Sequence, residues 1–354
     1  MSGRNDWELT IATPEDSLGI QKVFDDGDFK GDISVKYSRA PDPYRSFQND
    51  GEHIVMSILK DTITSEILGF GGVVIRKGYV NGVLRNTGYL TGLKILQSHQ
   101  RRVNCIKQAY QLIGEQTAKY TPFYYTTILK SNESAIELLE KRRKGMPPYI
   151  YVGEYTVFCF GVGGKTNSRG YTVRKGHTEK LTAFYKKHLP NYNLAPDNER
   201  LYGLDDNDFY YLQSPTGEIL AACAIWNQQS YKQYIISGYS GIYKAFSLIP
   251  TAWLGYPTMP KAGTSANYAS IAALVVPEEN RDIARLFLKL VLHEAKQFDF
   301  VMLGLFENHP LMYAAKRIKH IKYQSRLYAV DYTGNGDLYG GIDGQSIMLE
   351  VGLL

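Results

Sequence analysis

Apolar residues in this chain fall into short blocks that turn signals separate, and the spacing inside each block predicts its structure. Blocks at 53–59 and 67–75 predict an antiparallel strand pair. An Asn81-Gly82 turn then leads to a strand over 89–96. After it, apolar residues recur every three or four positions and predict a helix from about residue 102. These residues are Val103, Ile106, Ala109, Tyr110 and Ile113.

The same order of elements occurs a second time. Strands predicted at 209–213 and 219–226 flank a Pro- and Gly-containing turn, and a strand at 268–276 leads into a helix with an apolar stripe. A strand running into a short helix begins near residue 11 and again near residue 173. An asparagine that follows a strand and precedes a helical pattern occurs at 132 and at 308. This repetition predicts a duplicated module.

The length of the chain and a glycine-rich stretch place the boundary between the two copies. A chain of 354 residues fits two domains, and the glycine-rich stretch 161–170 predicts a linker between domains 1–163 and 164–354. Gly164-Lys165-Thr166 resembles the end of a phosphate-binding loop, but Cys159 stands where that motif requires its first glycine, and a strand follows instead of a helix.

Composition and turn signals give expectations for three further segments. An extra apolar stretch near 239–267, rich in Pro and Gly, is an insertion that either covers a cleft or the other domain or forms a packed irregular loop, the reading we favour. Residues 25–51 are predicted to form a loop region, and residues 346–353 a last strand.

Composition narrows the class of protein. Hydrophobic residues at 44% and charged residues at 21% are typical of a globular protein. The absence of an apolar run of ~20 residues and the polar start of the chain predict a cytoplasmic protein with no membrane partner. A net charge of +5 favours an anionic ligand and is too small for a dedicated nucleic-acid binder. Three cysteines and seven scattered histidines predict no disulfide framework and no metal site.

The order of elements resembles that of the GNAT acyltransferases. In that family the long central strand is followed by a loop whose backbone N–H groups hold the pyrophosphate of coenzyme A at a helix start, where free amides and the helix dipole favour an anion. The resemblance implies an α/β (α+β) fold of two GNAT-like domains, each a mixed, mostly antiparallel sheet flanked by helices. It implies these cofactor-binding residues: Lys94, Ile95, Leu96, Gln100, Arg101, Arg102, Val103, Asn104, Cys105 and Asn132.

The two copies match the family loop unequally. In the second copy Glu278, Glu279 and Asp282 place negative charge where a pyrophosphate would lie. In the first copy Arg101 and Arg102 supply donors that suit phosphate. The acyl-CoA site is therefore predicted in the N-terminal domain.

The helix that follows the asparagine carries the second family signature. Asn132 is followed by Ala135 and Leu138 at the family's spacing, and both Asn132 and Asn308 are predicted helix N-caps. The tyrosine that in the family often protonates the departing thiolate is replaced by Leu139, and by Ala315 in the second copy. No catalytic residue can be named from the sequence.

The resemblance implies an acyl-CoA-dependent N-acyltransferase. It would transfer an acetyl group from acetyl-CoA to an amine on a small molecule or peptide, by direct attack on a thioester held by the backbone amides of 94–96. Two alternatives stay open: a non-catalytic ligand-binding or scaffolding protein of this fold, and a ligase that takes aminoacyl groups from tRNA. The modest net charge disfavours the second alternative.

Overall fold

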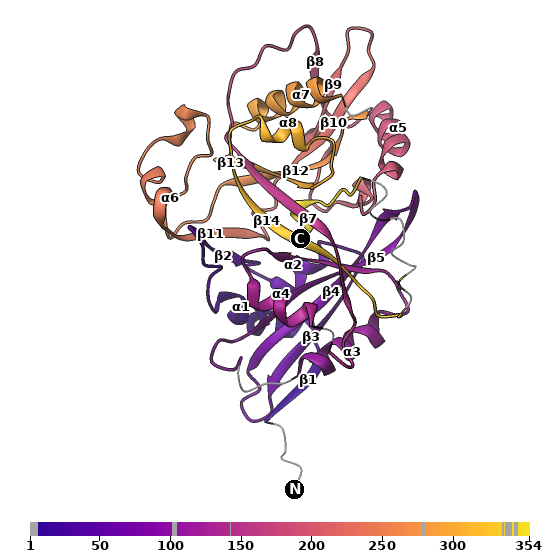
Figure 1. Ribbon diagram of the computed structural model, residues 1–354, viewed down its shortest axis with the longest axis vertical. Helices are drawn as coiled ribbons and strands as arrows, with labels where there is room; N and C mark the ends of the chain where they lie inside the picture. Colours follow the sequence, from indigo (N-terminus) through magenta and orange to yellow (C-terminus); the bar gives the residue numbers. More distant parts are fainter. Residues whose placement is uncertain are drawn as a thin grey trace.

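The computed structural model describes residues 6–100, 105–141, 143–277, 280–334, 336, 342 and 346–354. Two lobes lie one above the other, each with strands and helices, and long strands cross between them (Figure 1). The strands that begin in the first half of the chain are β1 Trp7–Ile11, β2 Ile33–Ser38, β3 His53–Asp61, β4 Ile67–Val80, β5 Val83–Ile95, β6 Tyr124–Leu129 and β7 Tyr149–Phe160. Those of the second half are β8 Thr172–Lys175, β9 Phe209–Gln213, β10 Ile219–Trp226, β11 Gln233–Tyr239, β12 Tyr268–Val275, β13 Phe300–Phe306 and β14 His320–Val330.

A single 12-stranded sheet runs through both lobes in the order β1-β3-β4-β5-β6-β14-β7-β13-β12-β10-β9-β8. Read from its two ends, the sheet repeats one pattern: three antiparallel strands, a parallel pair and an antiparallel strand. The parallel pair is β5 with β6 in one half and β12 with β13 in the other. The predicted class, a mixed and mostly antiparallel sheet flanked by helices, is confirmed, and the two expected sheets are joined into one.

The two halves exchange their last strands. β14 comes last in the sequence but pairs with β6, from Ser325 opposite Leu129 to Ala329 opposite Tyr125. β7 belongs to the first half of the sequence but pairs with β13. Because β7 and β14 also pair with each other over most of their length, neither half closes its sheet without a strand from the other.

Several of the helices begin at a residue whose side chain caps the first turn. They are α1 Ser17–Asp25, α2 Pro43–Gln48, α3 Ile106–Thr117, α4 Glu133–Glu140, α5 Glu179–His188, α6 Gly241–Phe246, α7 Arg281–Glu294 and α8 Met312–Lys316. The side chains of Asn132, Thr178 and Asn280 each accept a backbone N–H from the first turn of α4, α5 and α7. In the N-terminal half α1 and α2 pack on one face of the sheet, and α3 and α4 pack on the other.

A buried ionic cluster lies where the halves meet. Arg39 Nη2 lies 2.8 Å from Asp50 Oδ2, and Lys232 Nζ, from the second half of the chain, lies 2.7 Å from Asp50 Oδ1. Beside the cluster, β2 and β11 form a separate antiparallel pair that also joins the two halves. Burial would raise the pKa of Asp50, but the two cations outweigh it and hold that pKa below its usual value.

Several local predictions were wrong. Residues 25–51 contain β2 and α2 and are not only loop. Residues 346–354 form no strand of the sheet but an extended segment that ends in a 3-10 turn, Val351–Leu353. Asn308 caps no helix, because α8 begins four residues later and the buried His309 accepts the Leu311 N–H there instead. The insertion at 239–267 carries α6, and several of its large apolar side chains are exposed, so it is not simply a packed irregular loop.

Candidate functional site

The parallel strands β5 and β6 separate soon after they meet. Among the described residues they pair only at Gly88 with Tyr124 and at Tyr89 with Tyr125. Beyond these pairs, the side chain of Thr126 still reaches the Leu90 carbonyl at 2.8 Å. The last residues of β5, up to Ile95, therefore have one edge that β6 does not cover.

A bulge bends β5 at the start of this uncovered edge. The register with β4 shifts between Phe70 and Gly72, and Gly92 adopts a φ of +74°. A side chain at Gly92 would lie 2.5 Å from the Phe70 ring, so both the backbone conformation and the close packing require glycine there. Leu93, the next residue, is 47% exposed.

The backbone N–H groups of the predicted residues at the end of β5 differ in whether they point toward β4 or toward the uncovered edge. The Leu96 N–H donates to the Leu68 carbonyl at 2.8 Å, so it takes part in the sheet. Successive amides of a strand point to opposite edges, which directs the Ile95 N–H toward the edge that β6 leaves uncovered. The Lys94 side chain contacts α1, where its Nζ donates to the Phe24 carbonyl near the end of that helix.

The loop after β5 begins against an acidic side chain. The Gln97 N–H donates to Asp26 Oδ2 at 2.6 Å, and the exposed Gln100 donates from Nε2 back to the Ile95 carbonyl at 3.3 Å. Arg101, Arg102, Val103 and Asn104 lie outside the described residues. The loop therefore starts anchored to the end of α1 and resumes at Cys105, the residue that precedes α3.

Cys105 is a buried packing residue. It lies against Leu59 and Leu68, and burial raises the pKa of its thiol. A reactive cysteine needs the opposite shift, because the thiolate is the nucleophile. Cys105 thus lies at the predicted helix start, in the place where the family has a small residue.

Asn132 is the N-cap of α4. Its Oδ1 accepts the Ala135 N–H at 3.2 Å, as the sequence predicted. We expect Asn132→Ala to lower the free energy of unfolding by about 1 kcal/mol, because that amide loses its acceptor. Asn132→Asp, which keeps the acceptor, should retain most of the stability, and urea titrations of the two variants measure the difference. Equal losses in both would contradict a capping role.

Leu139 and Ala315, which stand where the family often has a tyrosine, supply no hydroxyl to the site. Leu139 is buried in the core between α3, α4 and the sheet, and Ala315 is buried beneath α7. Tyr89 lies in the last pair before β5 and β6 separate, and its hydroxyl lies 2.8 Å from Thr127 Oγ1 while its ring lies 5.2 Å from the Arg76 guanidinium carbon. Burial raises the pKa of Tyr89 to about 12, so it is protonated at neutral pH.

The C-terminal half contains the same separation and the same bulge. β12 and β13 pair only from Tyr268 with Phe300 to Ser270 with Met302 in the described chain. The register of β12 against β10 then shifts by one residue, and Ala273 adopts a φ of +49° at the position equivalent to Gly92. This conformation is rare for a residue with a side chain, so the fold maintains it against a local cost.

In this half the separation is filled by residues 346–354 of the chain itself. Glu350 Oε1 accepts the N–H of the bulge residue Ala273 at 2.8 Å. Met348 and Leu349 pack beside it against the ends of β12 and β13, leaving a cavity of about 10 Å³, the smallest that could hold one water. Tyr155 of β7 donates to the Leu349 carbonyl and holds the segment in place.

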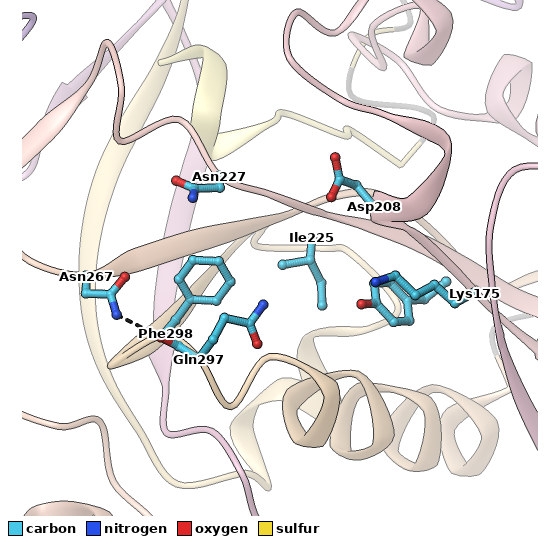
Figure 2. Close-up of a pocket in the computed structure, with 8 residues that line it drawn as sticks. Lys175, Asp208, Ile225, Asn227, Asn267, Gln297 and Phe298 are labelled. Atoms are coloured by element: carbon cyan, nitrogen blue, oxygen red, sulfur yellow. Dashed lines mark hydrogen bonds between the residues drawn. The ribbon is translucent and has the colours of Figure 1, made fainter.

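A larger open pocket of about 400 Å³ lies elsewhere in the C-terminal half. Figure 2 shows its lining: Lys175, Asp208, Tyr210, Ile225, Asn227, Asn267, Gln297 and Phe298. The pocket extends across the sheet from Asn267, which precedes β12, to Ile225 of β10, Tyr210 of β9 and Lys175 of β8. Its lining shares no residue with the small cavity beside Glu350.

Sequence reasoning missed two parts of this arrangement. It assigned 346–353 to a strand because Asn335-Gly336 predicts a turn before it, although Glu350 is an unusual residue for a buried strand. It also missed the cluster of Arg39, Asp50 and Lys232, because the members are far apart in the sequence and only the fold brings them together.

Comparison with solved structures supports the fold. No family model and no curated protein matches the sequence. The structure is similar to a glucosamine N-acetyltransferase region of a fungal multi-domain β-N-acetylglucosaminidase, with a TM-score of 0.63 and 12% identity. That match covers 93% of this chain but only 38% of the fungal protein.

Two further matches extend over nearly the whole of both chains. For the Saccharomyces cerevisiae N-myristoyltransferase with bound myristoyl-CoA, the TM-score is 0.58 and the identity 9%, over 99% of this chain and 90% of that one. For a GCN5-related N-acetyltransferase from Sphaerobacter thermophilus, the values are 0.53 and 13%, over 92% and 96%. The chain therefore has the fold of the GNAT superfamily.

Proposed function

We propose that this protein is an acyl-CoA-dependent N-acyltransferase with a single acyl-CoA site, in its N-terminal half. The observation that carries the proposal is the different state of two equivalent bulges. The Ala273 amide in the C-terminal half is bonded to Glu350, and the 346–354 segment fills the space beside it. In the N-terminal half β6 does not cover the equivalent strand end, and Leu93 is exposed beside it.

The residues along the uncovered edge suit a thioester with an apolar arm. An acyl-CoA would supply the activated acyl group, as a thioester, and an anionic pyrophosphate. The Ile95 N–H is the donor that we assign to the thioester oxygen, because the Leu96 N–H is already bonded within the sheet. Leu93 offers an apolar surface next to it, and Gln100 to Cys105 lead into the start of α3, where the helix dipole favours phosphate.

The acceptor amine must lose a proton before it attacks. No carboxylate is assigned as the base, since the acids nearest the end of β5, Asp25 and Asp26, are engaged with Lys36 and with the Gln97 N–H. The Arg76 guanidinium lies against Tyr89 and places a positive charge next to the strand separation. This charge favours neutral or anionic groups in the space between β5 and β6. We propose an acetyl or longer acyl donor and an amine acceptor on a small molecule or peptide.

The proposal is tested by calorimetric titration with acetyl-CoA and with myristoyl-CoA. We expect one binding site per chain, and the double variant Arg101→Ala/Arg102→Ala should bind at least about tenfold more weakly, because charge-assisted bonds to phosphate contribute about 1.5–3 kcal/mol each. The matched control is Lys186→Ala/Lys187→Ala, which removes two exposed cations from the last turn of α5 in the C-terminal half and should leave affinity unchanged.

Two outcomes would reject the proposal. One is the absence of binding heat with either thioester at high concentration, which would favour a non-catalytic protein of this fold. The other is an equal loss of affinity in the test and control variants, which would indicate nonspecific attraction between the cationic chain and the phosphates.

A further inference from the structure

The insertion between β11 and β12 exposes a group of large apolar side chains, here called the apolar patch. Leu248 is 82% exposed and Trp253 is 89% exposed. The complete patch is Ile242, Leu248, Ile249, Trp253 and Leu254. Figure 1 shows α6 and the loop around it projecting from the side of the C-terminal lobe. Five large apolar side chains exposed within thirteen residues are unusual on a protein surface and mark an interaction site.

The backbone that carries the patch is held firmly. Thr251 is buried and donates to the Pro257 carbonyl, Tyr239 donates to the Pro260 carbonyl, and Lys319 Nζ donates to the Leu254 carbonyl at 2.7 Å. A short 3-10 turn, Thr251–Leu254, ends at Gly255 in the left-handed conformation. Because the backbone is bonded to the body while the side chains stay in solvent, their exposure belongs to the fold.

Charge around the patch indicates its partner. Residues 219–277 contain no Asp and no Glu, and the insertion carries Lys244 and Lys261. Lys319 adds a third cation beside Leu254. The acids that reach the insertion are Asp32 and Asp299, at its base, where their backbone carbonyls accept from Ser240 and Thr258. The Asp32 carboxylate also accepts from Ser240 Oγ at 3.2 Å, so one acid lies at the start of α6.

We propose that the apolar patch inserts into the interfacial layer of a lipid bilayer that contains anionic lipids. A tryptophan and aliphatic side chains with lysines around them form the composition that binds there, since the rings and chains enter the headgroup boundary while the lysines contact anionic headgroups. No helix in the described part of the chain is long and apolar enough to span a membrane. The prediction of no membrane partner was based on the lack of such a span, which does not bear on a surface contact. The proposal is independent of acyl transfer.

The test is sedimentation of the full chain with vesicles of phosphatidylcholine alone and of phosphatidylcholine mixed with phosphatidylglycerol. We expect binding to the mixed vesicles and a blue shift of the Trp253 emission, which the Trp253→Phe variant identifies by difference from Trp7 and Trp226. Leu248→Ser/Trp253→Ser should lower the partition coefficient at least about tenfold, and Lys244→Ala about fivefold. The matched control is Ile63→Ser, which removes an apolar side chain that is 83% exposed in the β3–β4 turn, and it should bind as the unchanged chain does.

Three results would overturn the proposal. The first is no sedimentation with mixed vesicles, and the second is unchanged binding by Leu248→Ser/Trp253→Ser. The third is a dimer mass in light scattering without lipid that becomes a monomer mass in the same double variant, since the patch would then be covered by a second copy of the chain. Circular dichroism of each variant shows whether it is folded, and Trp253→Phe supplies a mild substitution should the double variant unfold.

Discussion

Asp50→Ala is expected to lower the free energy of unfolding by about 3–5 kcal/mol. The variant leaves Arg39 buried with no counter-charge. It also removes the carboxylate that favours the charged form of Lys232, whose pKa burial lowers to about 7, and all three side chains are at most 3% exposed. Removing one partner of a buried ion pair costs more than the pair contributes, because the remaining charge stays desolvated. Equilibrium unfolding in urea, followed by circular dichroism, measures the loss.

The matched control for this prediction is an exposed ion pair. Glu137 and Lys141 form an i,i+4 pair with side chains 69% and 60% exposed, and Glu137→Ala should change stability by no more than ~0.5 kcal/mol. A loss below about 1 kcal/mol for Asp50→Ala would mean that water reaches the cluster and that the junction between the halves is open. Because Lys232 and Asp50 lie in different halves of the chain, a large loss would show that this junction stabilises the whole fold.

Glu350→Gln is expected to stabilise the protein at neutral and higher pH but not at pH 5. Burial raises the pKa of Glu350 to about 7 from an ordinary value of 4.5, and the hydrogen bond from Ala273 only partly opposes this rise. As the pH rises above 4.5 the unfolded chain therefore loses its proton before the folded chain does, and stability falls until about pH 7. Glutamine is neutral throughout and keeps the oxygen that accepts the Ala273 N–H.

The expected gain at pH 8 is on the order of 3 kcal/mol, with little difference at pH 5. Urea titrations of the unchanged protein and the variant at both values measure it. Glu218→Gln, an exposed glutamate in the β9–β10 turn, is the control and should shift stability equally at both values. A gain from Glu350→Gln that does not depend on pH would contradict a buried Glu350 whose pKa is raised in the separation of β12 and β13.

A stabilised Glu350→Gln variant also informs the proposed function. If the C-terminal half has no acyl-CoA site because the 346–354 segment occupies it, the variant should still bind one acyl-CoA per chain. The carboxylate would then be a structural group retained at a cost in stability, and the bulge at Ala273 a remnant of the pattern that Gly92 preserves in the other half.

The sequence by itself determined the local elements. Strands β9 and β10 were predicted at their observed bounds, the Asn81-Gly82 turn joins β4 to β5 as expected, and Asn132 caps α4. These features depend on neighbours within a few residues: alternation of side chains, a turn that needs positive φ, and a cap that bonds three residues ahead. The order of the elements then sufficed to predict the fold, which the comparison with solved structures confirms.

Only the tertiary structure decided which half keeps an open strand separation. β7 and β14 are equally strand-like in sequence, and nothing local says that they exchange between the halves. The 346–354 segment is apolar enough to be a strand, and it fills the separation of β12 and β13 because β7 supplies the Tyr155 hydroxyl there and Ala273 supplies an amide. Such contacts join residues 77 to 194 positions apart, and their energy depends on burial that no local pattern of residues encodes.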